Sequence, residues 1–242
     1  NIHFKYILFK IINLKKKTLL FIHTPKCGGT SVSYSMRNKK FFFNLSHSVI
    51  RKNFSDKTIP IGLIGKNINK NKNNLFFSTV RNPFLLLRSY YHHVLTRNIN
   101  TNHYDYESAN KGFEYFIENI MNRDNAWPSR KFLFPVLFND DSDLVCDYIF
   151  RIENFNNEIN LFNEIKIKKI ELINVSKHKE ENLKYYFSDK LITEVNNVYK
   201  REFAMFGYNN FSFHKKEKKQ LLGDTRNSKI KYNYQEDKII NF

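Results

Sequence analysis

The sequence predicts an α/β fold with a mainly parallel central sheet. Two short apolar runs, at residues 18–23 and 75–80, are each followed closely by a segment with helical character, at 32–37 and 83–96. Strands that alternate with helices are typical of parallel sheets, because the crossover helices cover the sheet faces. Ligands of such sheets bind outside the carboxyl ends of the strands. We therefore expect functional residues directly after these two apolar runs.

The other elements are predicted from local composition and periodicity. Further strands are expected at 59–64, 144–150 and 169–175, and further helices at 113–117, 156–164 and 189–203. Polar composition predicts loops at 67–74, 98–111 and 125–130. The chain is therefore expected to contain a basic lead-in at 1–17, one folded domain at 18–213, and a lysine-rich polar tail at 214–242 that is poorly ordered.

Length and charge narrow the class of protein. A chain of 242 residues with 41% hydrophobic residues fits one α/β domain with a real core. The formal net charge of +17 predicts an anionic partner, such as a nucleotide, an acidic glycan, a membrane surface or nucleic acid. A composition rich in lysine and asparagine is also produced by biased genome base content, so charge only supports other observations. Cys27 and Cys146 are too few for a disulfide framework.

Membrane insertion is not expected from this sequence. No stretch approaches the roughly 20 apolar residues of a membrane span. The apolar segment 6–14 is short, is interrupted by Lys10 and has no small-residue cleavage site, so no signal peptide is predicted. A cytoplasmic location is expected if the source is bacterial or viral. Because the sequence begins at Asn1, an upstream membrane anchor stays open.

Residues 24–31, which read T-P-K-C-G-G-T-S, have the composition of an anion site. Gly28 and Gly29 allow the backbone to approach a phosphate, and the N–H groups and dipole of the following helix favour negative charge. Lys26 adds a positive charge. The lysine precedes the glycine pair, so the segment is not the Walker A pattern G-x-x-x-x-G-K-[ST]. An ordinary strand–turn–helix junction is the alternative.

A second motif follows the apolar run at 75–80. Residues 81–91 read R-N-P-F-L-L-L-R-S-Y-Y, which places a serine eight residues after Arg81. Together the two motifs resemble those of the sulfotransferase superfamily, and F-I-H-T-P-K at 21–26 is most similar to the carbohydrate sulfotransferase branch. Weaker similarity returns at 151–155, 173–176 and 199–208, so the resemblance spans roughly residues 19–208.

The resemblance implies a P-loop NTPase-like fold of three layers and a nucleotide co-substrate, 3′-phosphoadenosine-5′-phosphosulfate (PAPS). A sulfuryl group would pass from PAPS to an acceptor hydroxyl, expected on a carbohydrate, with no metal. Lys26 would stabilise charge on the bridging oxygen as the sulfur–oxygen bond breaks, and Arg81 and Ser89 would hold the 3′-phosphate. The 5′ side of the donor would contact Pro25, Lys26, Cys27, Gly28, Gly29, Thr30 and Ser31.

The acceptor side is predicted from the same resemblance. His47 is expected to be the general base, because it follows the first helix at about the place of a catalytic histidine in related carbohydrate sulfotransferases. An imidazole that titrates near neutral pH suits this role. Trp127 is expected to stack on a sugar ring and Arg130 to meet an acidic sugar. The other candidates for the base are His23, His103, Asp105 and Glu107.

Two other functions stay open. A kinase or nucleotide hydrolase on a related fold usually holds Mg²⁺ through a carboxylate at a strand end, but Arg81 and Asn82 follow the run at 75–80. A non-catalytic polyanion-binding or nucleic-acid-binding protein would explain the charge of +17 and the many aromatic residues. No recognised nucleic-acid motif is present, so no nucleic-acid partner is expected, and the sequence favours the enzyme.

Overall fold

The structure is a computed structural model of the 242-residue chain. It describes residues 18–37, 42–45, 74–97, 104–122, 137, 144–159, 170, 173, 183–208, 230–233 and 238–241. The chain divides into two compact units, which are treated separately below. The first contains Asn1–Val80, Phe134–Ile173 and Leu222–Phe242, and the second contains Arg81–Leu133 and Asn174–Leu221.

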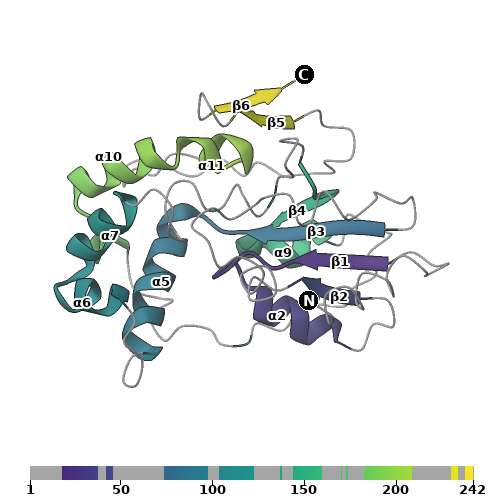
Figure 1. Ribbon diagram of the computed structural model, residues 1–242, viewed down its shortest axis with the longest axis horizontal. Helices are drawn as coiled ribbons and strands as arrows, with labels where there is room; N and C mark the ends of the chain where they lie inside the picture. Colours follow the sequence, from purple (N-terminus) through teal and green to yellow (C-terminus); the bar gives the residue numbers. More distant parts are fainter. Residues whose placement is uncertain are drawn as a thin grey trace. The chain divides into compact units, whose positions relative to one another are not determined.

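The first unit is built on a parallel sheet (Figure 1). Its four strands are β1 (Thr18–Ile22), β2 (Phe42–Leu45), β3 (Asn74–Val80) and β4 (Tyr148–Arg151). They run in the order β2-β1-β3-β4, and every neighbouring pair is parallel. The prediction of an α/β protein with a parallel sheet is therefore confirmed.

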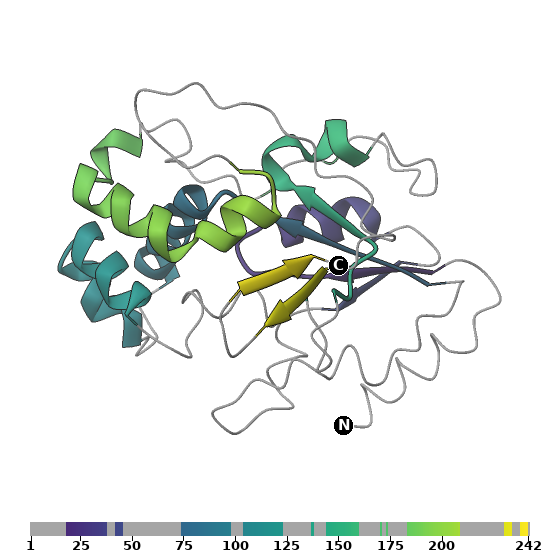
Figure 2. The ribbon, with the colours of Figure 1, turned by 90° about the horizontal axis from the view of Figure 1, so that it is seen from above.

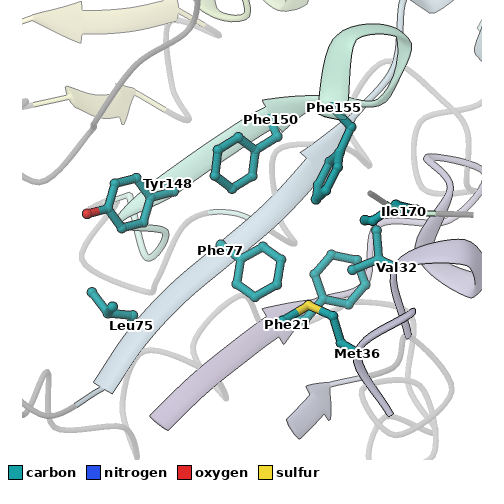
Figure 3. Packing of buried hydrophobic residues seen from close by; sticks show 9 residues of the cluster. All are labelled: Phe21, Val32, Met36, Leu75, Phe77, Tyr148, Phe150, Phe155 and Ile170. Atoms are coloured by element: carbon teal, nitrogen blue, oxygen red, sulfur yellow. The ribbon is translucent and has the colours of Figure 1, made fainter. Parts of the chain in front are cut away.

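Aromatic side chains from three strands form the core on one face of this sheet (Figure 3). The Phe77 ring lies 5.1 Å from the Phe21 ring and 6.1 Å from the Phe150 ring, measured between centroids. Helix α2 (Gly29–Met36) adds Val32 and Met36 to this cluster, and the short helix α9 (Phe155–Ile159) adds Phe155. Residues of the other face, including Leu20, Phe76 and Ile149, are buried too. Burial on both faces is usual for parallel sheets.

Two elements of this unit differ from the predictions. β4 begins at Tyr148 rather than at 144. The turn η2 (Ile152–Asn154) leads into α9 (Phe155–Ile159), which covers the described part of the predicted helix at 156–164, and residues 160–164 lie outside the described residues. The tail was expected to be poorly ordered, but it contains the antiparallel hairpin β5 (Ile230–Asn233) and β6 (Lys238–Asn241), shown in Figure 2. Alternating apolar and polar residues, I-K-Y-N, make the first of these segments a reasonable strand despite its charge.

The second unit is helical. Its helices are α5 (Pro83–Arg97), α6 (Tyr104–Asn110), α7 (Phe113–Met121), α10 (Asp189–Val198) and α11 (Lys200–Met205), with the turn η3 (Leu183–Tyr185) before α10. Asn82 caps α5, because its Oδ1 accepts a hydrogen bond from the Phe84 N–H at 3.0 Å. Pro83 then occupies the first helical position, where its missing N–H costs nothing. The predicted helices at 83–96 and 113–117 are confirmed.

The predicted loop at 98–111 is wrong in its second half. Residues 104–110 form α6, whose Asp105 is fully buried and accepts a hydrogen bond from the Tyr90 hydroxyl of α5. The predicted helix at 189–203 is divided, since Tyr199 leaves helical geometry at φ −102° and ψ 20°. Burial and the neighbouring Glu202 raise the pKa of the Tyr199 phenol far above its usual range.

Some predictions fall outside the described residues. These are the lead-in at 1–17, the strand at 59–64, the loop at 125–130, the loop at 67–73 and most of the strand at 169–175. Among the helices that the structure describes, none has both the length and the apolar character needed to cross a membrane.

Candidate anion site after the first strand

The turn after β1 has an unusual backbone. Lys26 and Gly28 both adopt left-handed conformations, with φ of 59° and 77°. The Cys27 N–H donates to the Thr24 carbonyl at 3.4 Å and closes the turn. A left-handed conformation costs a lysine about 1–2 kcal/mol, because its Cβ crowds the following carbonyl oxygen. Strain of this kind in non-glycine residues is concentrated at functional sites.

Both glycines of the turn are required by packing. A Cβ at Gly28 would lie 2.4 Å from Ile152 Cδ1, and one at Gly29 would lie 2.1 Å from His23 Cδ2. The His23 ring is itself held by a stacked contact with Phe21, with 5.8 Å between ring centroids. The turn therefore lies directly against side chains from the ends of β1 and β4.

The backbone N–H groups at the amino end of α2 have no hydrogen-bond acceptor inside the helix. Gly28 is the N-cap residue and has no side chain that could accept a hydrogen bond. The N–H groups of Gly29, Thr30 and Ser31 lie in the first turn, where a helix provides them with no carbonyl partner. None of the first-turn residues of α2, all of which the structure describes, is acidic. The site has the polarity that favours an anion.

The two hydroxyl residues of this turn differ in their surroundings. The Ser31 Oγ donates to the Ile173 carbonyl at 3.1 Å and accepts from the Ile173 N–H at 3.1 Å, and Ser31 is buried. Thr30 has an exposed side chain. The Ser31 hydroxyl therefore attaches a distant chain segment to α2, and Thr30 carries the hydroxyl that solvent reaches.

Hydroxyl groups also join the ends of β1 and β3. Thr24 is fully buried, and its Oγ1 donates to the Thr79 carbonyl and lies 3.5 Å from Ser78 Oγ. The Ser78 hydroxyl donates to the Ile22 carbonyl at 2.7 Å. These bonds fix where the chain leaves β1, and therefore where the turn begins.

The strand order gives this turn its place in the sheet. The connection that leaves β1 leads to β2 on one side, whereas the connection that leaves β3 leads to β4 on the other. Ligands of open α/β sheets bind at such a reversal of strand order, outside the carboxyl ends. The anion site is therefore where the topology predicts a ligand.

The predicted loop residues can now be placed. Lys26 is partly exposed, whereas Pro25 and Cys27 are buried. Since Pro25 has no N–H and the Cys27 N–H is used by the turn, both shape the backbone around the site. Cys27 forms no disulfide and its side chain is fully buried, which fits a small residue that fills the loop.

The second predicted phosphate motif lies in the helical unit. Arg81 directly follows β3 in the chain and is partly exposed. Leu85 and Ser89 are also partly exposed and lie four residues apart on α5, which puts them on one face of the helix. Leu86 is fully buried, and the Arg88 guanidinium lies over the Tyr186 ring at 5.8 Å. Arg88 is therefore directed into this unit.

The predicted acceptor residues are mostly outside the described part of the chain. His47, Trp127, Arg130 and His103 all lie there. Of the other candidates for the base, Asp105 is buried against Tyr90, and Glu107 is exposed on α6.

Sequence reasoning missed the roles of His23, Ile152 and Ile173 in building the turn. Two of them, Ile152 and Ile173, lie in the segments 151–155 and 173–176, which show weak similarity to sulfotransferases. Comparisons of the chain with protein-family models, curated proteins and solved structures find no match.

Proposed function

We propose that the chain is a sulfotransferase with a P-loop NTPase-like fold, which transfers a sulfuryl group from PAPS to an acceptor hydroxyl, expected on a carbohydrate. The observation that carries the proposal is the turn at Lys26 to Thr30. It combines a left-handed lysine, two sterically required glycines and an uncapped helix N-terminus at the carboxyl end of a central strand. Together with the motif similarity, this favours a phosphosulfate ligand.

The roles follow from the chemistry of the groups. Backbone N–H groups of the first turn of α2 would bind the oxygens of the 5′-phosphosulfate, with the Thr30 hydroxyl beside them. Lys26 would stabilise the negative charge that develops on the bridging oxygen as the sulfur–oxygen bond breaks. Arg81 and Ser89 are assigned to the 3′-phosphate from the motif similarity, and His47 to the removal of the acceptor proton.

A kinase or nucleotide hydrolase would use the same kind of turn. It would need a carboxylate near the end of β3 to hold Mg²⁺, but the described residues there are Ser78, Thr79, Val80, Arg81 and Asn82. Neutral and cationic side chains suit a donor that is bound without a divalent cation.

Calorimetric titration of the full chain tests the proposal. Adenosine 3′,5′-bisphosphate, the product left after sulfuryl transfer, should bind in the presence of EDTA. ATP with Mg²⁺ should bind more weakly, because it lacks the 3′-phosphate. Tighter binding of ATP with Mg²⁺ would assign the chain to phosphoryl transfer instead. Binding that is equal for both nucleotides and for heparin, and that falls steeply with salt, would show a non-specific polyanion binder.

A further inference from the structure

The carboxyl end of β3 contains a buried hydroxyl group that the described hydrogen bonds leave unused. Thr79 is fully buried, and its Oγ1 has no hydrogen-bond partner among the residues that the structure describes. The neighbouring buried hydroxyls of Thr24 and Ser78 both donate to backbone carbonyls. Buried polar atoms in native proteins are nearly always satisfied, so an exception calls for an explanation, of which a bound ligand is one.

Strand geometry places this hydroxyl on the face of the sheet that α2 covers. Side chains alternate along a strand, so Thr79 shares a face with Phe77, which packs with Val32 of α2. The register pairs Ile22 with Ser78, the last pair between the two strands, and His23 and Thr79 are the residues that follow these two in the chain. The His23 ring lies against Gly29. Thr79 therefore lies in the row of side chains beneath the glycine turn.

The strand on the other side of Thr79, β4, is followed by a residue that contacts the same turn. Thr79 pairs with Phe150 of β4, and Ile152, two residues farther along the chain, contacts Gly28. The turn thus lies against one residue from each strand that flanks Thr79. Thr79 is therefore flanked on both sides by chain segments that contact the turn at the start of α2.

The first-turn N–H groups of α2 and the Thr79 hydroxyl can all act as hydrogen-bond donors. The first-turn N–H groups have no acceptor inside the helix, and a threonine hydroxyl can rotate to direct its proton toward a new acceptor. We propose that the Thr79 hydroxyl is a further ligand of the anion at the glycine turn, donating a hydrogen bond to one oxygen of a bound tetrahedral oxyanion. The inference rests on the proposed function in taking that oxyanion to be the 5′-phosphate or the sulfuryl group of the donor.

Three variants of the full chain test this assignment. Thr79→Val keeps the shape and removes the hydroxyl, Thr79→Ser keeps the hydroxyl, and Ser78→Ala removes a neighbouring hydroxyl that already has an acceptor. Thermal unfolding is measured without ligand, and affinity is measured by calorimetry with adenosine 3′,5′-bisphosphate and, separately, with inorganic sulfate.

Thr79→Val should raise the unfolding temperature by about 2–4 °C, because an unsatisfied buried hydroxyl is removed. The same change should weaken binding of adenosine 3′,5′-bisphosphate by about tenfold, the usual effect of losing one hydrogen bond to a charged group. Thr79→Ser should bind within about twofold of the unchanged protein. Ser78→Ala should lower the unfolding temperature and leave affinity unchanged, which is the opposite pattern.

Each other result overturns the assignment. A more stable Thr79→Val variant with unchanged affinity would show a buried threonine that does not contact the ligand, and a less stable one would show a hydroxyl with a structural role. If the unchanged protein binds sulfate but not the bisphosphate, the proposed function fails, and Thr79 is judged by the loss of sulfate affinity alone. If the unchanged protein binds neither, both proposals are wrong.

Discussion

The contact between His23 and Gly29 can be tested with a double-mutant cycle, in which the effect of Gly29→Ala on the free energy of unfolding should depend on whether His23 is present. In the unchanged protein, Gly29→Ala would place a Cβ 2.1 Å from two atoms of the His23 ring, far inside van der Waals contact. The ring cannot move away without leaving its stacked position on Phe21. Overpacking of this kind typically costs about 1–3 kcal/mol, and we expect the upper part of that range.

The same substitution should behave differently once the ring is gone. In a His23→Ala background the clash is removed, and Gly29, unlike Gly28, does not have a left-handed backbone. Alanine is then favoured over glycine at a helical position by up to about 1 kcal/mol. Gly29→Ala should therefore be destabilising alone and neutral or stabilising beside His23→Ala, with a coupling energy of about 2–4 kcal/mol.

Urea unfolding of the four proteins measures this coupling, provided that the dependence on urea is the same in all of them. Gly112→Ala is the matched control. Gly112 has a φ of 112°, and a Cβ added there would meet no atom within 4 Å, so its cost comes from the backbone alone and should not depend on His23. Effects of Gly29→Ala and His23→Ala that add within about 0.5 kcal/mol would refute the packing described here.

Three further outcomes are expected. Lys26→Ala should lower the rate of sulfuryl transfer, measured with radiolabelled PAPS, by at least about 100-fold with no loss of thermal stability. The control is Lys190→Ala, which removes an exposed lysine paired with an acidic side chain and should change neither quantity. Full activity of Lys26→Ala would contradict the proposed mechanism. Arg81→Ala should weaken the binding of adenosine 3′,5′-bisphosphate, measured by calorimetry, at least about tenfold more than the binding of adenosine 5′-phosphate. Equal losses of affinity for the two nucleotides would show that Arg81 does not bind the 3′-phosphate. Glu158→Gln should lower the free energy of unfolding, measured in urea, by about 3–5 kcal/mol. The Glu158 carboxylate lies 2.7 Å from Nε of the buried Arg151 guanidinium, and the substitution removes this counter-charge. A decrease under about 1 kcal/mol would show that water screens the pair.

Local sequence patterns predicted the elements whose residue types match their burial in the structure. β1 and β3 are short apolar runs, and both are buried along nearly their whole length. The start of α5 was predicted from Pro83, which is favourable at the first position of a helix; the cap that Asn82 provides is seen only in the structure. The turn between β1 and α2 was also predicted, because two adjacent glycines follow an apolar run and precede a segment with helical character.

The errors have tertiary causes. α6 looked like a loop because its sequence, Y-D-Y-E-S-A-N, is polar, and the burial of Asp105 against Tyr90 depends on a helix 15 residues away in sequence. Ser31 was assigned to the 5′ side of the donor from the sulfotransferase resemblance, and that assignment stays a prediction; what the sequence did not show is how Ser31 is bonded. Its backbone partner, Ile173, is 142 residues distant, so no local pattern could reveal it. The same holds for Thr79, whose environment is set by β1, β4 and α2 together.

The interleaving of the two units has a consequence for synthesis on the ribosome. The first unit is assembled from three separate stretches of chain, and Ser31 meets its partner only when Ile173 has been made. The two residues are 142 positions apart, so at about 5–20 residues per second roughly 7–28 s pass between them. After β3 is made, β1 and β3 lack β4 until Arg151 has been added, and throughout the interval the first turn of α2 lacks the segment that Ser31 holds. The candidate anion site is therefore one of the last parts of the sheet unit to be completed, and a chain stopped before β4 is made should expose the apolar sheet to chaperones.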